Sequence, residues 1–108
     1  MSKLLTMKCK PCRAGIEALA GDALSALAAE LDGWDVIAGH HLAKQYGFDD
    51  FAGALGFVNR LAVVAESEGH HPNISFTWGK VAVEVFTHDI DGLSDNDFIL
   101  AAKIDAVL

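Results

Sequence analysis

Three of the five histidines in this chain, His70, His71 and His88, lie in its second half. Imidazole has an unperturbed pKa of roughly 6.5, so it can donate and accept protons near neutral pH. Glu66 and Asp97 are carboxylates of the kind that fix the tautomer and the angle of a nearby histidine ring. The group predicts acid–base chemistry, with the three histidines as catalytic candidates and the two carboxylates as orienting residues.

This interpretation has one geometric condition and one rival, a metal site. Neighbouring side chains in an extended segment point to opposite faces, so His70 and His71 enter one pocket only if the chain bends there. Histidines with a carboxylate also have the donor types for zinc or iron, but adjacent histidines rarely bind one metal and no HExxH spacing is present. We therefore expect no metal at this site. His40 and His41 are interpreted as structural residues of a turn.

The elements around the histidines follow from apolar spacing. A helix capped by Asp49 or Asp50 is predicted up to Gly69, which can take the left-handed conformation that ends a helix. Pro72 pushes His71 towards extended geometry, so the histidine pair lies in a fixed corner. The apolar stripe of this helix is expected to comprise Phe51, Ala54, Leu55, Val58, Leu61, Ala62 and Ala65.

Beyond the corner the pattern changes to alternation. Ile74, Phe76 and Trp78 alternate with polar residues, Gly79-Lys80 turns the chain, and a returning strand leads to His88. Ser94 and Asp97 have the spacing of a capping box, which predicts a third helix that runs to the terminus. Both strands and this helix start therefore converge on the histidine region.

The first half predicts a helix over Asp22–Leu31, with Asp22 as N-cap, and a hairpin formed by Trp34–Ala38 and His41–Phe48 around Gly39-His40. The resulting fold class is α+β, a four-stranded antiparallel sheet with three helices packed on one face in the order α-β-β-α-β-β-α. The second sheet face is expected to carry Trp, Phe and Val groups, so we predict a homo-oligomer that covers them.

Composition limits the class of protein. The chain of 108 residues is 52% hydrophobic and carries a formal net charge of −7, which fits one acidic domain. Eight Lys and Arg residues form no cluster, so nucleic acid is not expected as a ligand. No apolar run approaches the roughly 20 residues of a membrane-spanning helix, and the first residues are too short for a signal peptide. We expect a soluble cytoplasmic protein with no membrane partner.

Cys9 and Cys12 form a CxxC pair near the N-terminus. Such a pair can be half of a zinc site or a redox dithiol. Zinc needs two more ligands and no second CxxC supplies them, while a thioredoxin-like dithiol needs a preceding strand. We interpret the segment as a mobile arm with two ordinary thiols.

Four motifs occur together in the region described above. They are Glu66-x-x-Gly69-His70-His71-Pro72, Trp78 before Gly79-Lys80-Val81, Thr87-His88-Asp89, and Gly92-Leu93-Ser94-x-x-Asp97. With this spacing the chain resembles pterin-4a-carbinolamine dehydratase, also called 4a-hydroxytetrahydrobiopterin dehydratase, from about Asp22 to the end. The resemblance divides the chain into an arm over residues 1–21 and a dehydratase-like domain over 22–108.

The resemblance implies a hydro-lyase activity. Enzymes of this family remove water from 4a-hydroxytetrahydropterin and give quinonoid dihydropterin, in tetrahydrobiopterin recycling. By this likeness His70, His71 and His88 line the pterin pocket, with Trp34, Glu66, Pro72, Asp89 and Asp97 as binding or orienting residues. An acid protonates the departing 4a-hydroxyl and a base takes the N5 proton, and we assign the proton transfers to His70 and His88 and pterin binding to His71. No cofactor is implied, because the pterin is the substrate.

The resemblance also bears on partners. It implies a homodimer or homotetramer that pairs through sheet and helices, and a pathway with aromatic amino acid hydroxylases or another pterin route. Gly69 stands where other members often have a polar residue, which removes one hydrogen bond beside His70. Animal members also bind a transcription factor through the self-association surface. A non-catalytic interaction module is therefore the alternative function.

Overall fold

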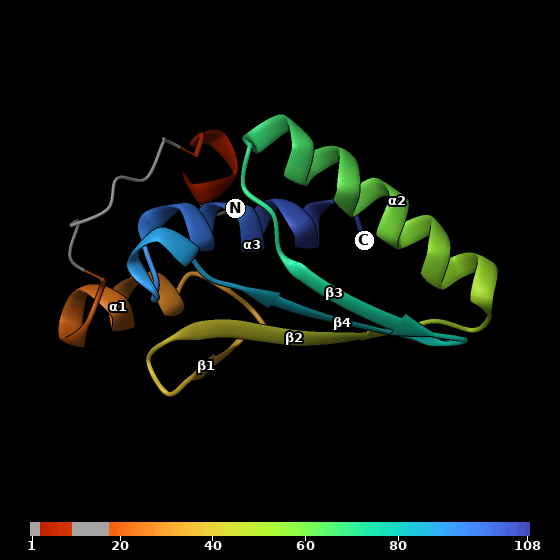
Figure 1. Ribbon diagram of the computed structural model, residues 1–108, viewed down its shortest axis with the longest axis horizontal. Coiled ribbons are helices and arrows are strands. Elements are labelled where there is room, and N and C mark those ends of the chain that lie inside the picture. The colour runs from red at the N-terminus through yellow and green to blue at the C-terminus, as the bar shows by residue number, and fades with distance from the viewer. Residues whose placement is uncertain (1–2, 10–17) are drawn as a thin grey trace.

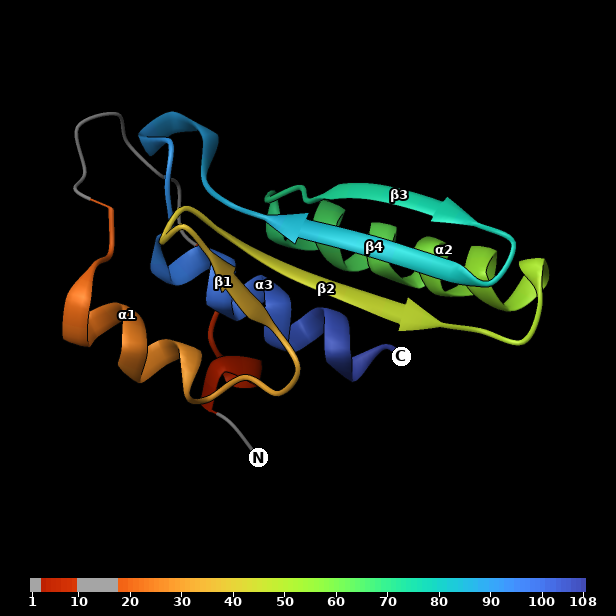
Figure 2. The ribbon, with the colours of Figure 1, turned by 90° about the horizontal axis from the view of Figure 1, so that it is seen from below.

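The computed structural model describes residues 3–9 and 18–108 and contains a four-stranded antiparallel sheet covered by helices on one face (Figure 1). The strand order is β1-β2-β4-β3, as the view from below shows (Figure 2). The elements in chain order are η1 (Lys3–Thr6), α1 (Gly21–Ala28), β1 (Asp35–Ile37), β2 (His41–Gly47), α2 (Phe51–Glu68), β3 (Asn73–Thr77), β4 (Lys80–Val85), η2 (His88–Ile90) and α3 (Asp95–Ala106). This confirms the predicted α+β class and the order α-β-β-α-β-β-α.

The helix starts depend on local side-chain bonds. Asp50 caps α2 by accepting a hydrogen bond from the Gly53 backbone N–H at 2.7 Å. The capping box of Ser94 and Asp97 is present at the start of α3. α1 differs from the prediction, because its N-cap is Ala20 and the helix ends at Ala28 rather than Leu31. The predicted Asp22 cap was therefore wrong. The Asp22 carboxylate lies in the first turn instead, where its negative charge interacts favourably with the positive end of the helix dipole.

The first hairpin turns one residue earlier than predicted. Ala38 and Gly39 both have positive φ, 54° and 65°, and the His40 N–H donates to the Ile37 carbonyl oxygen at 2.9 Å. Two central residues with positive φ define a type I′ turn, whose twist matches that of the flanking strands. The turn is therefore centred on Ala38-Gly39, and His40 becomes the last residue before β2.

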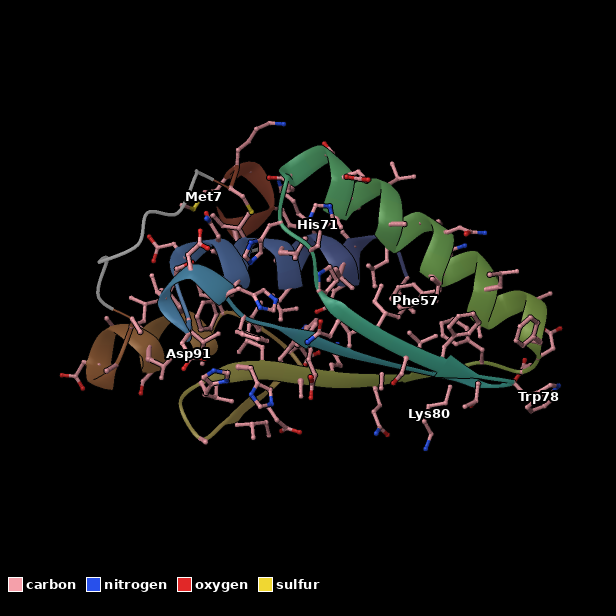
Figure 3. All side chains as sticks on the ribbon, viewed as in Figure 1. Met7, Phe57, His71, Trp78, Lys80 and Asp91 are labelled. Carbon is pink, nitrogen blue, oxygen red and sulfur yellow. The ribbon has the colours of Figure 1, made fainter. Side chains whose placement is uncertain are left out.

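The face of α2 that packs on the sheet is also offset from the predicted stripe. Phe57 is fully buried and points from α2 towards the sheet (Figure 3), although it was not in the predicted stripe. Phe51, Leu55 and Ala62 were in that stripe but are exposed. The buried positions are Ala54, Phe57, Leu61 and Ala65. Because α2 is apolar around most of its circumference, its periodicity fits two neighbouring faces.

The two faces of the sheet differ in polarity. Val81, Val83 and Val85 of β4 are buried under the helices. Residues on the opposite face alternate with them, and the register pairs Ala43 with Glu84 and Ser75 with Ala82 there. The open face is thus largely polar or small. The expected Val groups are instead buried on the other face, whereas Phe86 continues the alternation of Ala82 and Glu84 on the open face beside His41. The argument for an oligomer that rested on that face no longer applies.

The N-terminal segment packs on the domain where the structure describes it. Leu4 in η1 is 1% exposed and belongs to the core, so residues 3–9 are not the mobile arm we expected. The Cys9 backbone N–H donates to Glu68 Oε1 at 2.9 Å, and its thiol lies 3.5 Å from the Asn96 carbonyl oxygen. Burial, together with the Glu68 carboxylate, raises the pKa of the Cys9 thiol to about 12, so little reactive thiolate forms near neutral pH. Cys12 lies outside the described residues.

Glu68 forms an acid-sensitive ion pair with Lys103 beneath the N-terminal segment. Its side chain is 5% exposed, and Glu68 Oε2 accepts from Lys103 Nζ at 2.8 Å. Burial would raise the pKa of Glu68, but the bonds from Lys103 and from the Cys9 N–H outweigh it and lower that pKa below 4.5. A group with a depressed folded-state pKa stabilises the fold above its unfolded pKa, and this stability is lost as the pH falls through the folded value.

We therefore expect urea unfolding to show that Glu68→Gln lowers the free energy of unfolding by about 2 kcal/mol at pH 7, with a smaller difference below pH 4. Glu66→Gln, two residues away on the same helix but exposed, is the matched control, because exposed ion pairs contribute little. Equal free energies for native protein and Glu68→Gln at both pH values would show that the buried pair does not stabilise the fold.

Candidate active site

The corner between α2 and β3 fixes the positions of His70 and His71. Gly69 takes the left-handed conformation with φ 64°, and the N–H groups of Gly69 and His70 donate to the Glu66 and Ala65 carbonyl oxygens. This is the Schellman pattern, which ends a helix sharply and turns the following chain. The half-buried Pro72 follows, and β3 starts at Asn73. The corner therefore has little freedom to change the direction of its two histidines.

His70 points towards the start of α3. Its Nε2 lies 2.6 Å from Asp97 Oδ1, and its side chain is only 14% exposed. Asp97 is fully buried, and its other carboxylate oxygen accepts from Thr87 Oγ1 and from the Ser94 backbone N–H, both at 2.8 Å. An ionised carboxylate only accepts hydrogen bonds, so the Nε2 that faces it carries a proton. The neutral ring then has Nδ1 left as the nitrogen that can take a proton.

His71 turns the other way. Its Nε2 lies 3.0 Å from Glu66 Oε2 on the last turns of α2, and both side chains are mostly exposed. Figure 3 shows His71 at the corner where α2 meets β3. The two adjacent rings thus bind different carboxylates, as expected for neighbouring residues of an extended segment. The bend that would have aimed both rings at one partner is not seen.

His88 follows the end of β4. It begins η2, its side chain is exposed, and its ring lies against Phe86 with 4.2 Å between the ring centroids. The preceding residue, Thr87, donates to the Asp97 carboxylate that also binds His70. Asp97 therefore joins the chain segment that carries His88 to the corner that carries His70. Asp89 follows His88 in η2 and is exposed.

Trp34 lies with a different group of residues. Its Nε1 donates to Asp105 Oδ2 at 3.0 Å, and Asp105 also accepts from Lys44 and from the Tyr46 hydroxyl. Burial and this hydrogen bond raise the pKa of Tyr46. Asp105 is eight residues beyond Asp97 on α3, which is roughly 12 Å along a helix. A place for Trp34 beside the histidines remains a prediction that these contacts do not support.

Sequence reasoning missed a second imidazole group beside His88. His40 Nε2 lies 2.7 Å from Asp91 Oδ1, and His40 Nδ1 lies 3.1 Å from His41 Nδ1. The His40 ring also lies against Phe86, the residue that His88 contacts. Two histidines at a predicted turn were the only signal in the sequence, and nothing local linked them to Asp91.

The described residues contain no group of three or more His, Cys, Asp or Glu side chains placed to hold one metal ion. Within the same residues, no helix is both long and apolar enough to cross a membrane. The arrangement that remains is a set of histidines bound to carboxylates: the pair of His70 with Asp97 is largely buried, and the pairs of His71 with Glu66 and of His40 with Asp91 are exposed. Such a set can transfer protons at an accessible ring nitrogen.

Comparison with known proteins identifies the family of this chain. The family model described as pterin 4 alpha carbinolamine dehydratase matches residues 17–107. A protein of Rubrobacter xylanophilus, provisionally named pterin-4-alpha-carbinolamine dehydratase, is 48% identical over 97% of this chain and 98% of its own. A Rickettsia canadensis protein with the same provisional name is 47% identical over 98% of each chain.

Two solved structures have a similar fold. A transcriptional coactivator/pterin dehydratase from Brucella melitensis has a TM-score of 0.79 and 29% identity, over 84% of this chain and 98% of that one. A pterin dehydratase-like protein identified as a RuBisCO assembly factor in the alpha-carboxysome has a TM-score of 0.61 and 26% identity, over 70% of this chain and 89% of that one. With the family model and the relatives above, these likenesses establish that the chain belongs to the pterin 4 alpha carbinolamine dehydratase family.

Proposed function

We propose that this protein dehydrates 4a-hydroxytetrahydropterin to quinonoid dihydropterin by histidine acid–base catalysis, in pterin recycling. The observation that carries the proposal is the 2.6 Å pair of His70 with the fully buried Asp97. A carboxylate held by two further hydrogen bonds fixes the tautomer of the ring and leaves its other nitrogen for proton transfer. Family membership supplies the substrate class.

The reaction needs two proton transfers. A protonated imidazole gives its proton to the 4a-hydroxyl, which leaves as water, and a second imidazole takes the proton from N5 as the N5–C4a double bond forms. We assign these transfers to His70 and His88, whose chain segments meet at Asp97. His71 with Glu66 is assigned to holding the pterin, and Trp34, Pro72 and Asp89 are the remaining proposed binding or orienting residues. The protons balance, so the step needs no other reactant.

The direct test is a stopped-flow assay that follows the decay of freshly generated 4a-hydroxytetrahydropterin. We expect native protein to accelerate this decay over buffer in proportion to protein concentration. Gln45→Ala is the matched control for protein quality, because Gln45 is exposed on the open face of β2. Native protein that leaves the decay at the buffer rate would defeat the proposed activity.

A protein-interaction module is the second candidate function, and the outer face of α2 favours it. Val63 is 71% exposed, and Phe51 and Leu55 on the same helix are also exposed. An apolar groove beside Val63 is lined by Leu5, Val64 and Val107. The names of the two solved relatives, a coactivator and an assembly factor, point in the same direction. Turnover that depends on His70 and His88 would favour the enzyme, since an interaction module does not need these rings.

The same helix face supports the proposed homo-oligomer. An exposed apolar side chain such as Val63 is covered at low cost by a second copy of the same helix. β3 is also an edge strand, so its unpaired backbone groups can pair with another strand. We propose a homodimer or homotetramer in the cytoplasm. Light scattering that gives the molar mass of a single chain would contradict this proposal.

A further inference from the structure

The ring of Phe86 contacts two histidines that are far apart in the sequence. Its centroid is 4.8 Å from the His40 ring and 4.2 Å from the His88 ring. His40 belongs to the turn before β2, and His88 begins η2 after β4. Because Phe86 is half-buried and in contact with both rings, the His40 ring limits the positions that Phe86, and so His88, can adopt.

A second contact runs from His40 to the backbone of the His88 turn. His40 Nε2 lies 2.7 Å from Asp91 Oδ1, and the Asp91 N–H donates to the His88 carbonyl oxygen at 3.1 Å. Asp91 closes η2 in the left-handed conformation, with φ 48° and ψ 49°. Outside glycine, this conformation is adopted most readily by Asn and Asp and needs support from its surroundings. His40 supplies part of that support. Figure 3 shows Asp91 at the turn outside the sheet.

We propose that His40 is a positioning residue for His88, acting through the Phe86 ring and through Asp91. This inference rests on the proposed function, in which His88 transfers a proton. His40 touches neither substrate nor reacting atoms in this scheme. Its effect is to keep the His88 ring in one orientation, so that a larger fraction of enzyme molecules has this ring in position for proton transfer.

The test compares His40→Ala, His40→Gln and the matched control His41→Ala, each in the full chain. His40→Ala removes both contacts to the His88 turn, and we expect kcat in the stopped-flow assay to fall by about tenfold while KM changes less than twofold. Glutamine keeps an N–H donor for Asp91. His40→Gln should thus recover most of kcat. His41→Ala should leave kcat at neutral pH within about twofold, because the Asp91 and Phe86 contacts remain.

NMR signals from the C–H protons of the His88 ring give a readout that does not need turnover. A ring held against Phe86 has a ring-current shift, and His40→Ala should reduce that shift while His41→Ala does not. A native kcat and an unchanged His88 signal in His40→Ala would each overturn the proposal. If native protein shows no turnover, the proposed function fails, and the NMR comparison still decides whether His40 fixes the His88 ring.

Discussion

Replacement of His88 by alanine is expected to slow the decay of 4a-hydroxytetrahydropterin by roughly 10²- to 10⁴-fold relative to native protein, the contribution of one well-placed acid or base. His88 is exposed at the start of η2, so its removal costs little packing and the protein should remain folded. His70→Ala should give a loss in the same range. The readout is kcat from single-turnover and steady-state stopped-flow traces.

The adjacent residue provides the control for this prediction. His71 is 60% exposed and paired with the exposed Glu66, whereas His70 is 14% exposed and paired with a buried carboxylate. His71→Ala should mainly raise KM, because its proposed role is to hold the pterin. If His71→Ala lowered kcat as much as His70→Ala does, or if His88→Ala kept kcat within twofold of native, the assignment of the proton transfers would be wrong.

The features that sequence could predict are those determined by neighbouring residues. The Asp50 cap, the capping box of Ser94 and Asp97 and the end of α2 at Gly69 each involve residues a few positions apart, and all three are present. Local patterns misplaced the hairpin turn because Ala38 adopts positive φ, which alanine rarely does. They also could not choose between two faces of α2, since the neighbouring positions are apolar as well.

The contacts that decide the site are of long range. Asp91 lies 51 positions from His40, and Asp105 lies 71 positions from Trp34. No periodicity connects such residues, so His40 was interpreted as part of an ordinary turn and Trp34 as a neighbour of the pterin. The three histidines and two carboxylates were proposed as site residues from residue type, because few side chains can exchange protons near neutral pH.

Replacement of Asp97 is expected to have the largest effect on stability. The carboxylate is fully buried and accepts hydrogen bonds from Thr87 Oγ1 and the Ser94 N–H, and it faces His70 Nε2. Asp97→Ala leaves these groups without an acceptor and removes half of the capping box. We expect the free energy of unfolding, measured in urea, to fall by about 3 to 5 kcal/mol. A fall of less than about 1 kcal/mol would show that water replaces the carboxylate.

Asp97→Asn separates stability from catalysis. The amide oxygen can still accept from Thr87 and from the Ser94 N–H, so the loss of stability should be much smaller than for alanine. The amide nitrogen, however, only donates, and it then faces His70 Nε2. His70 must present an unprotonated Nε2 to it and carry its proton on Nδ1, so the neutral ring no longer has Nδ1 free for proton transfer. We therefore expect kcat to fall roughly 10²-fold or more in a protein that remains folded. A native kcat in folded Asp97→Asn would show that the tautomer of His70 does not control the reaction.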